Sequence, residues 1–164
     1  MSFGFLVAGF LATTNAGRVA LAARAGAPSR RERIVAPLAG AAVIVGATLA
    51  ADGVLDALSI TPESFRIAAG IVLIAAGGRT IVWPAPAAPF AAILVTPELT
   101  MLSLSFGADE PNAKVLAAAL PAFAVLALAY RAGRRDTSAV AAQFLAALEL
   151  VVAVALIVAG IRDV

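Results

Sequence analysis

The 164-residue sequence is 62% hydrophobic and only 13% charged, with a mean hydropathy of +1.00, whereas a soluble domain is roughly 45–50% apolar and about 25% charged. This composition excludes a large soluble domain and indicates a chain that lies in a lipid bilayer, and the absence of cysteine and histidine excludes disulfides, thiolate nucleophiles and imidazole bases. We therefore expect no enzyme, no metal and no cofactor, and we interpret the net charge of +2 as a signal for membrane orientation rather than for nucleic acid.

Apolar runs separated by charged or proline-bearing breaks predict six transmembrane helices. They cover residues 3–23, 34–51, 65–82, 88–106, 113–130 and 139–161. No basic residue precedes Arg18, as the n-region of a signal peptide requires, so we interpret the first run as a retained span. The expected fold class is an all-α integral membrane protein, with residues 1–164 as a single membrane domain.

Loop charges predict the orientation of these spans. The loops after the first, third and fifth spans carry eight basic residues, and the opposite side carries three. Because arginine-rich loops stay in the cytoplasm, we expect both termini outside a cell (plasma or inner) membrane. The eight are Arg24, Arg30, Arg31, Arg33, Arg79, Arg131, Arg134 and Arg135, and the three are Arg66, Lys114 and Arg162.

A proline-rich segment at residues 83–89 divides the chain into two repeats, residues 1–83 and 84–164. Each repeat has three predicted spans, so corresponding helices run in opposite directions, as in inverted-repeat transporters. The leading helix of each repeat is interrupted near its centre, at residues 13–18 and at residues 96–100. Asn, Thr, Gly and Pro at these places predict that helices 1 and 4 are broken and line a cavity. Kinks satisfied by neighbouring helices are the alternative.

Three ionisable side chains fall inside predicted spans: Arg18, Glu98 and Glu149. Each costs about 2.5–3.5 kcal/mol at the centre of a membrane helix, so we expect Arg18 and Glu98 to form a buried ion pair where the breaks meet. One carboxyl group then has no basic partner, which makes Glu98 and Glu149 the candidates for proton coupling. Alternatively, Arg18 reaches the cytoplasmic interface, and Glu149 contacts hydroxyl groups or a partner protein. The predicted substrate-binding residues are Thr14, Asn15, Gly17, Arg18, Thr96, Pro97 and Glu98.

Residues 60–71, with the sequence Ile-Thr-Pro-Glu-Ser-Phe-Arg-Ile-Ala-Ala-Gly-Ile, resemble the opening of the third span in the MarC family of neutral amino-acid transporters. Residues 160–162 and the placement of the two polar breaks are weaker similarities. The resemblance implies a six-span inverted repeat related to the LysE-type exporters, with transport of small amino acids or similar metabolites. The breaks keep only the family's glycine, at Gly17, and its proline, at Pro97, so the chain resembles a divergent, short member.

These features favour a small secondary transporter or exporter whose halves move about a site at the membrane midplane. The sequence holds no Gly-x-x-x-x-Gly-Lys-Ser/Thr loop for nucleotide phosphates, so we expect gradients to supply the energy. One cationic and one anionic group near half-helix ends suit a small zwitterionic or neutral solute. The alternative is a non-transporting scaffold or an accessory subunit of a larger complex, and a homo-oligomer fits either function.

Overall fold

The computed structural model describes residues 1–25, 29–83, 95–131 and 138–164, and within these ranges the chain forms helices and no strand. The all-α fold predicted from composition is confirmed for these ranges. Residues 84–89 of the proline-rich segment, Arg134 and Arg135, and the beginning of the predicted fourth span lie outside the described residues. The helices are α1 (Phe3–Thr14), α2 (Ala16–Ala25), α3 (Arg30–Leu58), α4 (Pro62–Val82), α6 (Pro97–Asp109), α7 (Asn112–Arg131) and α8 (Ser138–Asp163).

Four stretches of the described residues are long and apolar enough to cross a membrane, which indicates a membrane protein. A further apolar stretch, in α7, is shorter. Helix α6 has 13 residues, about 20 Å of helix, whereas the hydrocarbon core of a bilayer is about 30 Å thick. Helix α6 is therefore too short to cross a bilayer by itself. The four stretches are Phe3–Ala22, Ile34–Leu58, Pro62–Val82 and Ala139–Asp163.

Helix α3 is longer at both ends than the predicted span over residues 34–51. It begins with a capping box, in which the Ser29 hydroxyl accepts a hydrogen bond from the Glu32 backbone N–H and the Glu32 carboxylate accepts one from the Ser29 N–H. It ends at Ser59, in the left-handed conformation with φ 52°. The predicted end at residue 51 is wrong because Asp52 and Asp56 are exposed on the helix surface, where a charge does not interrupt the backbone hydrogen bonds.

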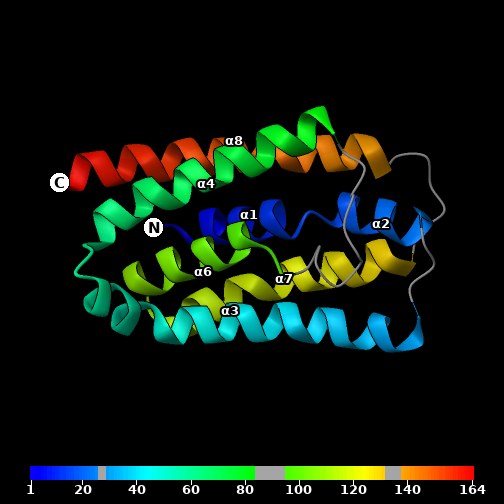
Figure 1. The fold of residues 1–164 in the computed structure, drawn as a ribbon, viewed down its shortest axis with the longest axis horizontal. Coiled ribbons are helices and arrows are strands. Elements are labelled where there is room, and N and C mark those ends of the chain that lie inside the picture. The colour runs from blue at the N-terminus through cyan, green and yellow to red at the C-terminus, as the bar shows by residue number, and fades with distance from the viewer. Residues whose placement is uncertain (26–28, 84–94, 132–137) are drawn as a thin grey trace.

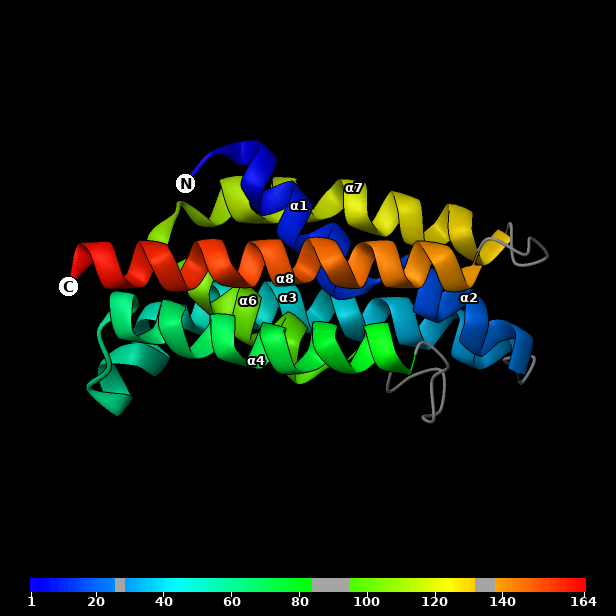
Figure 2. The ribbon, with the colours of Figure 1, turned by 90° about the horizontal axis from the view of Figure 1, so that it is seen from above.

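The helices lie lengthwise in one bundle (Figure 1). Helices α1 and α2 follow one another through its middle, α4 and α8 lie side by side, and α3 lies on the opposite side. Both termini and the α3–α4 and α6–α7 connections are at one end, which we call the terminal end, while α2, α4 and α7 finish at the other end. Figure 2 shows α8 along the length of the bundle, with α4 on one side and α1 and α7 on the other. Helix α6 begins part way along the bundle rather than at an end.

Small residues set the closest helix contacts. Where α4 crosses α8, a Cβ atom added to Gly70 would lie 2.7 Å from the Ala153 carbonyl oxygen, and one added to Gly77 would lie 3.0 Å from that of Ala146. Glycine lets the two backbones approach where lipid offers no hydrophobic drive for association. The shorter helices pack across the bundle, α2 against α7 and α8, and α6 against α3 and α4.

Candidate functional site

The interruption predicted in the first span occurs at Asn15, between α1 and α2. Asn15 adopts the left-handed conformation with φ 37° and ψ 71°, which asparagine tolerates better than most residues. Its side-chain Nδ2 donates to the Ala142 carbonyl oxygen of α8 at 3.1 Å, and its Oδ1 accepts from the Arg18 backbone N–H at 3.2 Å. One side chain thus caps the beginning of α2 and fixes the break against α8.

The residues beside Asn15 hold the break in place. The Thr14 hydroxyl donates to the Phe10 carbonyl oxygen at 2.7 Å, within α1. A Cβ atom on Gly17 would lie only 2.3 Å from the Ala142 backbone nitrogen, so glycine is required for α2 to approach α8 this closely. Thr14 and Gly17 are predicted substrate-binding residues; the structure gives Gly17 a role in positioning α2, and the Thr14 hydroxyl bonds within α1.

The second predicted interruption, at residues 96–100, coincides with the beginning of α6, and the part of the predicted fourth span before residue 95 lies outside the described residues. Thr96 is the N-cap residue, and its hydroxyl accepts a hydrogen bond from the Leu99 backbone N–H at 3.3 Å. Pro97 occupies the first turn, where its missing N–H costs nothing. Glu98 follows in that turn, where the partial positive charge of the helix N-terminus favours a carboxylate. Helix α6 begins part way along the bundle (Figure 1), and Glu98 is buried, with 7% of its surface exposed.

Arg18 and Glu98 form the predicted ion pair, with 3.6 Å between Arg18 Nη1 and Glu98 Oε1. The two side chains are 21% and 10% exposed. Arg18 lies in the first turn of α2 and Glu98 in the first turn of α6, so the pair joins the two helix beginnings. At 3.6 Å the pair is too long for a direct hydrogen bond.

Glu149 of α8 lies in the same electrostatic environment. Its side chain is buried, and its Oε1 has no hydrogen-bond partner among the described residues. Asn15 and Gly17, just before Arg18, contact Ala142, which lies two helical turns before Glu149 on the same face of α8. The structure thus places in one region of the bundle the three ionisable residues that the sequence places inside spans, one from each of α2, α6 and α8. We call Arg18, Glu98 and Glu149 the central charge cluster.

Arg66 and Lys114, which the sequence analysis uses only as signals of membrane orientation, form ion pairs at the terminal end. Arg66 of α4 donates two hydrogen bonds of 2.6 Å to the Asp109 carboxylate of α6 and also pairs with Asp163 of α8. Glu110, directly after α6, pairs with Lys114 at 2.6 Å, and this ammonium lowers the pKa of Glu110 below its ordinary value. Sequence spacing does not reveal the first of these clusters, because its members come from three different helices.

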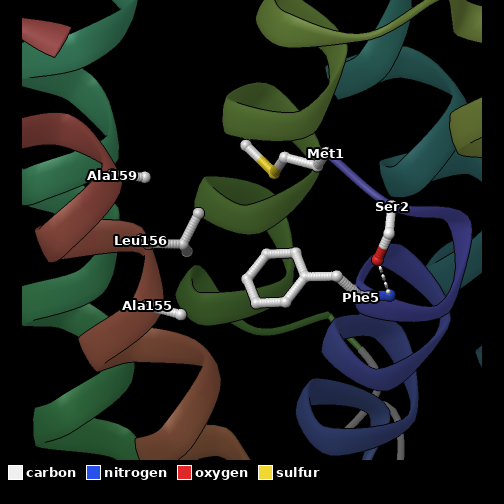
Figure 3. Close-up of a pocket in the computed structure, with 6 residues that line it drawn as sticks. All are labelled: Met1, Ser2, Phe5, Ala155, Leu156 and Ala159. Carbon is white, nitrogen blue, oxygen red and sulfur yellow. Dashed lines mark hydrogen bonds between the residues drawn. The ribbon is translucent and has the colours of Figure 1, made fainter. Parts of the chain in front are cut away.

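Sequence reasoning also missed an apolar pocket of about 270 Å³ between α1 and α8 at the terminal end (Figure 3). None of its lining side chains is ionisable, and therefore no motif marked it; the N-terminal ammonium of Met1 pairs with Glu110. The lining residues are Met1, Ser2, Phe5, Ala155, Leu156 and Ala159.

Comparisons of the chain with protein-family models, with curated proteins and with solved structures each found no match. The class of protein therefore follows from the structure. In the described ranges it is an all-helical membrane protein in which an Arg18–Glu98 ion pair joins the beginnings of two short helices.

Proposed function

We propose that this protein is a small secondary transporter or exporter that binds a small zwitterionic or neutral solute, such as a neutral amino acid, at Arg18 and Glu98. The observation that carries this proposal is the 3.6 Å ion pair between the first turns of α2 and α6. Such a pair offers a cation for a solute carboxylate and an anion for a solute ammonium group. The backbone N–H groups at the beginnings of α2 and α6 add partial positive charge that favours the carboxylate of the solute.

Glu149 supplies the proposed coupling to protons. The central charge cluster contains one base and two acids, and Glu149 Oε1 is the oxygen without a partner among the described residues. A buried carboxylate without a partner is costly in a membrane, so uptake of a proton neutralises the surplus charge. Release of that proton on one side of the membrane would link solute movement to the proton gradient.

The proposed architecture is an inverted repeat of residues 1–83 and 84–164, in which α2, α3 and α4 correspond to α6, α7 and α8. The packing supports this correspondence. Helix α2 packs against α7 and α8, and α6 packs against α3 and α4, so each short helix contacts the last two helices of the other repeat. The helices that correspond to each other at the end of the repeats, α4 and α8, pack together. A two-fold axis that relates the two repeats requires each helix of one repeat to contact the other repeat in the same way as its counterpart does, and these contacts follow that pattern.

We further propose six spans in the cell membrane, with the arginine-rich loops in the cytoplasm and both termini outside, as in a divergent member of the MarC family. The grouping of both termini with the α3–α4 and α6–α7 connections at one end supports an even number of crossings (Figure 1). A consistent excess of arginine in the loops of the opposite end supports the orientation.

The proposal is tested by solute uptake into proteoliposomes containing the full chain, with a panel of radiolabelled zwitterionic amino acids and neutral metabolites. We expect Arg18→Gln and Glu98→Gln to abolish the uptake that the wild type shows. Arg162→Gln is the matched control, because Arg162 is exposed at the end of α8 and its loss should leave uptake unchanged. Uptake by the wild type no greater than by protein-free liposomes would favour the non-transporting scaffold.

Proton coupling has its own measurement in the same vesicles. We expect the dependence of flux on pH to disappear in Glu149→Gln, while solute binding to Arg18 and Glu98 persists. If neither Glu98→Gln nor Glu149→Gln changes the flux or its pH profile, the coupling role is wrong.

A further inference from the structure

The apolar pocket at the terminal end is aligned with the central charge cluster. Figure 3 shows Phe5 of α1 projecting between the helices toward Leu156 of α8. Leu156 follows Glu149 by seven residues, which is two helical turns, so the two side chains share one face of α8 about 10 Å apart. Going from the pocket along that face of α8 therefore leads to Glu149. The pocket's volume of about 270 Å³ lies near the lower limit for pockets that bind small molecules.

A cluster of three phenylalanine rings closes the space between the pocket and the charges. The Phe106 ring of α6 lies edge-on to Phe5, with ring centroids 5.9 Å apart, and edge-on to Phe10, with centroids 5.6 Å apart. Phe106 is fully buried. Its ring rests on Gly9, where an added Cβ atom would lie 2.9 Å from Phe106 Cζ. The Phe106 ring is thus packed between α1 and α6, against Phe5, Gly9 and Phe10.

Phe106 and Glu98 belong to the same helix, α6, which links this closure to the central charge cluster. Phe106 is eight residues after Glu98, about 12 Å along the helix. A displacement of α6 therefore moves Glu98 and Phe106 together. Phe5 lines the pocket on one side and contacts Phe106 on the other.

We propose that the pocket is the entrance chamber for the solute at the terminal end, and that Phe106 is the plug that separates this chamber from the central charge cluster. The apolar lining selects a small solute with an uncharged, apolar part, which occupies the chamber while the plug is closed. When α6 moves, Phe106 leaves its seat on Gly9 and the polar end of the solute reaches Arg18 and Glu98. The identity of the occupant rests on the proposed transport function, whereas the passage and its plug do not.

Because the chain contains no cysteine, single cysteines report directly on the passage. Val152 of α8 is 2% exposed and lies between Glu149 and Leu156 in the sequence. A Val152→Cys variant of the full chain in proteoliposomes is treated with a membrane-impermeant methanethiosulfonate that carries a trimethylammonium group. We expect slow modification with the plug intact and a rate about tenfold higher with Phe106→Ala, because the open state becomes more populated.

The matched control is Phe65→Ala, which also removes a buried phenylalanine, 6% exposed, from α4. Phe65 belongs to a core cluster that packs against α6 but does not line the pocket, so this variant controls for a general loosening of α6. Equal rates for Val152→Cys in the Phe106→Ala and Phe65→Ala backgrounds would overturn the plug. Where Phe106→Ala does not fold, as judged by gel filtration in detergent, Phe106→Leu replaces it, and a rate above that in the Phe65→Ala background is again expected.

A second pair of variants tests the chamber. Ala155 lines the pocket, whereas the neighbouring Val154 is exposed on the outer surface of α8. We expect the reagent to modify Ala155→Cys rapidly and Val154→Cys slowly, since lipid excludes a charged reagent. An unreactive Ala155→Cys means a chamber filled by a lipid acyl chain or closed to water, and overturns the proposal. The modification rates can be measured without a transported solute, so the two proposals can fail separately. If the wild type transports solute but the cysteines do not react as expected, the passage is rejected and transport stands. If the cysteines react as expected but the wild type shows no solute flux, transport is rejected and the passage stands.

Discussion

Replacement of Arg18 is the sharpest test of the central charge cluster. Two unit charges 3.6 Å apart attract one another by roughly 5 kcal/mol at an effective dielectric constant of about 20. Desolvation offsets part of this attraction. We expect Arg18→Gln to lower the free energy of unfolding by about 3 kcal/mol, because it leaves Glu98 and Glu149 as two buried carboxylates without a base. Glu98→Gln should cost less, since Arg18 and Glu149 then remain as a pair of opposite charge.

The assay is reversible unfolding by sodium dodecyl sulfate in mixed micelles, followed by far-ultraviolet circular dichroism. A double-mutant cycle of Arg18→Gln and Glu98→Gln should give a coupling free energy of about 1–3 kcal/mol. Arg162→Gln, at an exposed position, should change stability by no more than about 0.5 kcal/mol. Effects of the two substitutions that add to within about 0.5 kcal/mol, or a larger cost for Glu98→Gln than for Arg18→Gln, would refute the reasoning.

Two further predictions concern helix packing and pH. Gly17→Ala should lower the free energy of unfolding by about 1–3 kcal/mol in the same assay, because its Cβ would lie 2.3 Å from Ala142 N. The control is Gly46→Ala, whose Cβ meets nothing within 4 Å and which should leave stability unchanged or raise it. Equal effects of the two substitutions would contradict the close α2–α8 contact. Lys114 lowers the pKa of Glu110, so this carboxylate stabilises the fold above its ordinary pKa, and the stabilisation is lost as the pH falls through the lowered value. The Tm advantage of the wild type over Glu110→Gln should therefore shrink between about pH 7 and about pH 3, and an advantage independent of pH would contradict it.

The break at Asn15 and the beginning of α6 could be predicted because their causes are local. Asn15 can adopt a left-handed conformation and cap the next helix, and Thr96 followed by Pro97 is a helix beginning in almost any context. The ion pair followed from a different argument, the cost of a lone charge in a membrane. Both arguments use only short-range chemistry or composition, and a single sequence contains that information.

The two ends of helix α3 and the Phe106 plug were harder to predict from the sequence. The Ser29 and Glu32 capping box is a local signal that extends α3 at its start, and the sequence contains it, whereas the helix end depended on whether Asp52 faces outward. The plug was invisible in the sequence because it depends on Phe106 meeting Gly9, almost a hundred residues away. A buried phenylalanine is ordinary by itself, and only the crossing of α1 and α6 makes it a closure.

Helix α6 is held by ion pairs at both ends, and the two attachments differ in strength. At the terminal end, Asp109 accepts two hydrogen bonds of 2.6 Å from Arg66, a bidentate geometry with strong directional preference. At the centre, Glu98 lies 3.6 Å from Arg18, without a direct hydrogen bond. A solute with a carboxylate and an ammonium group can replace the second attachment at little cost, while the first stays closed and acts as the pivot. Occupation of the central charge cluster then releases the beginning of α6. A rotation of the helix about the first attachment moves Glu98 farthest, and it moves Phe106, three residues before Asp109, by a smaller distance away from Gly9.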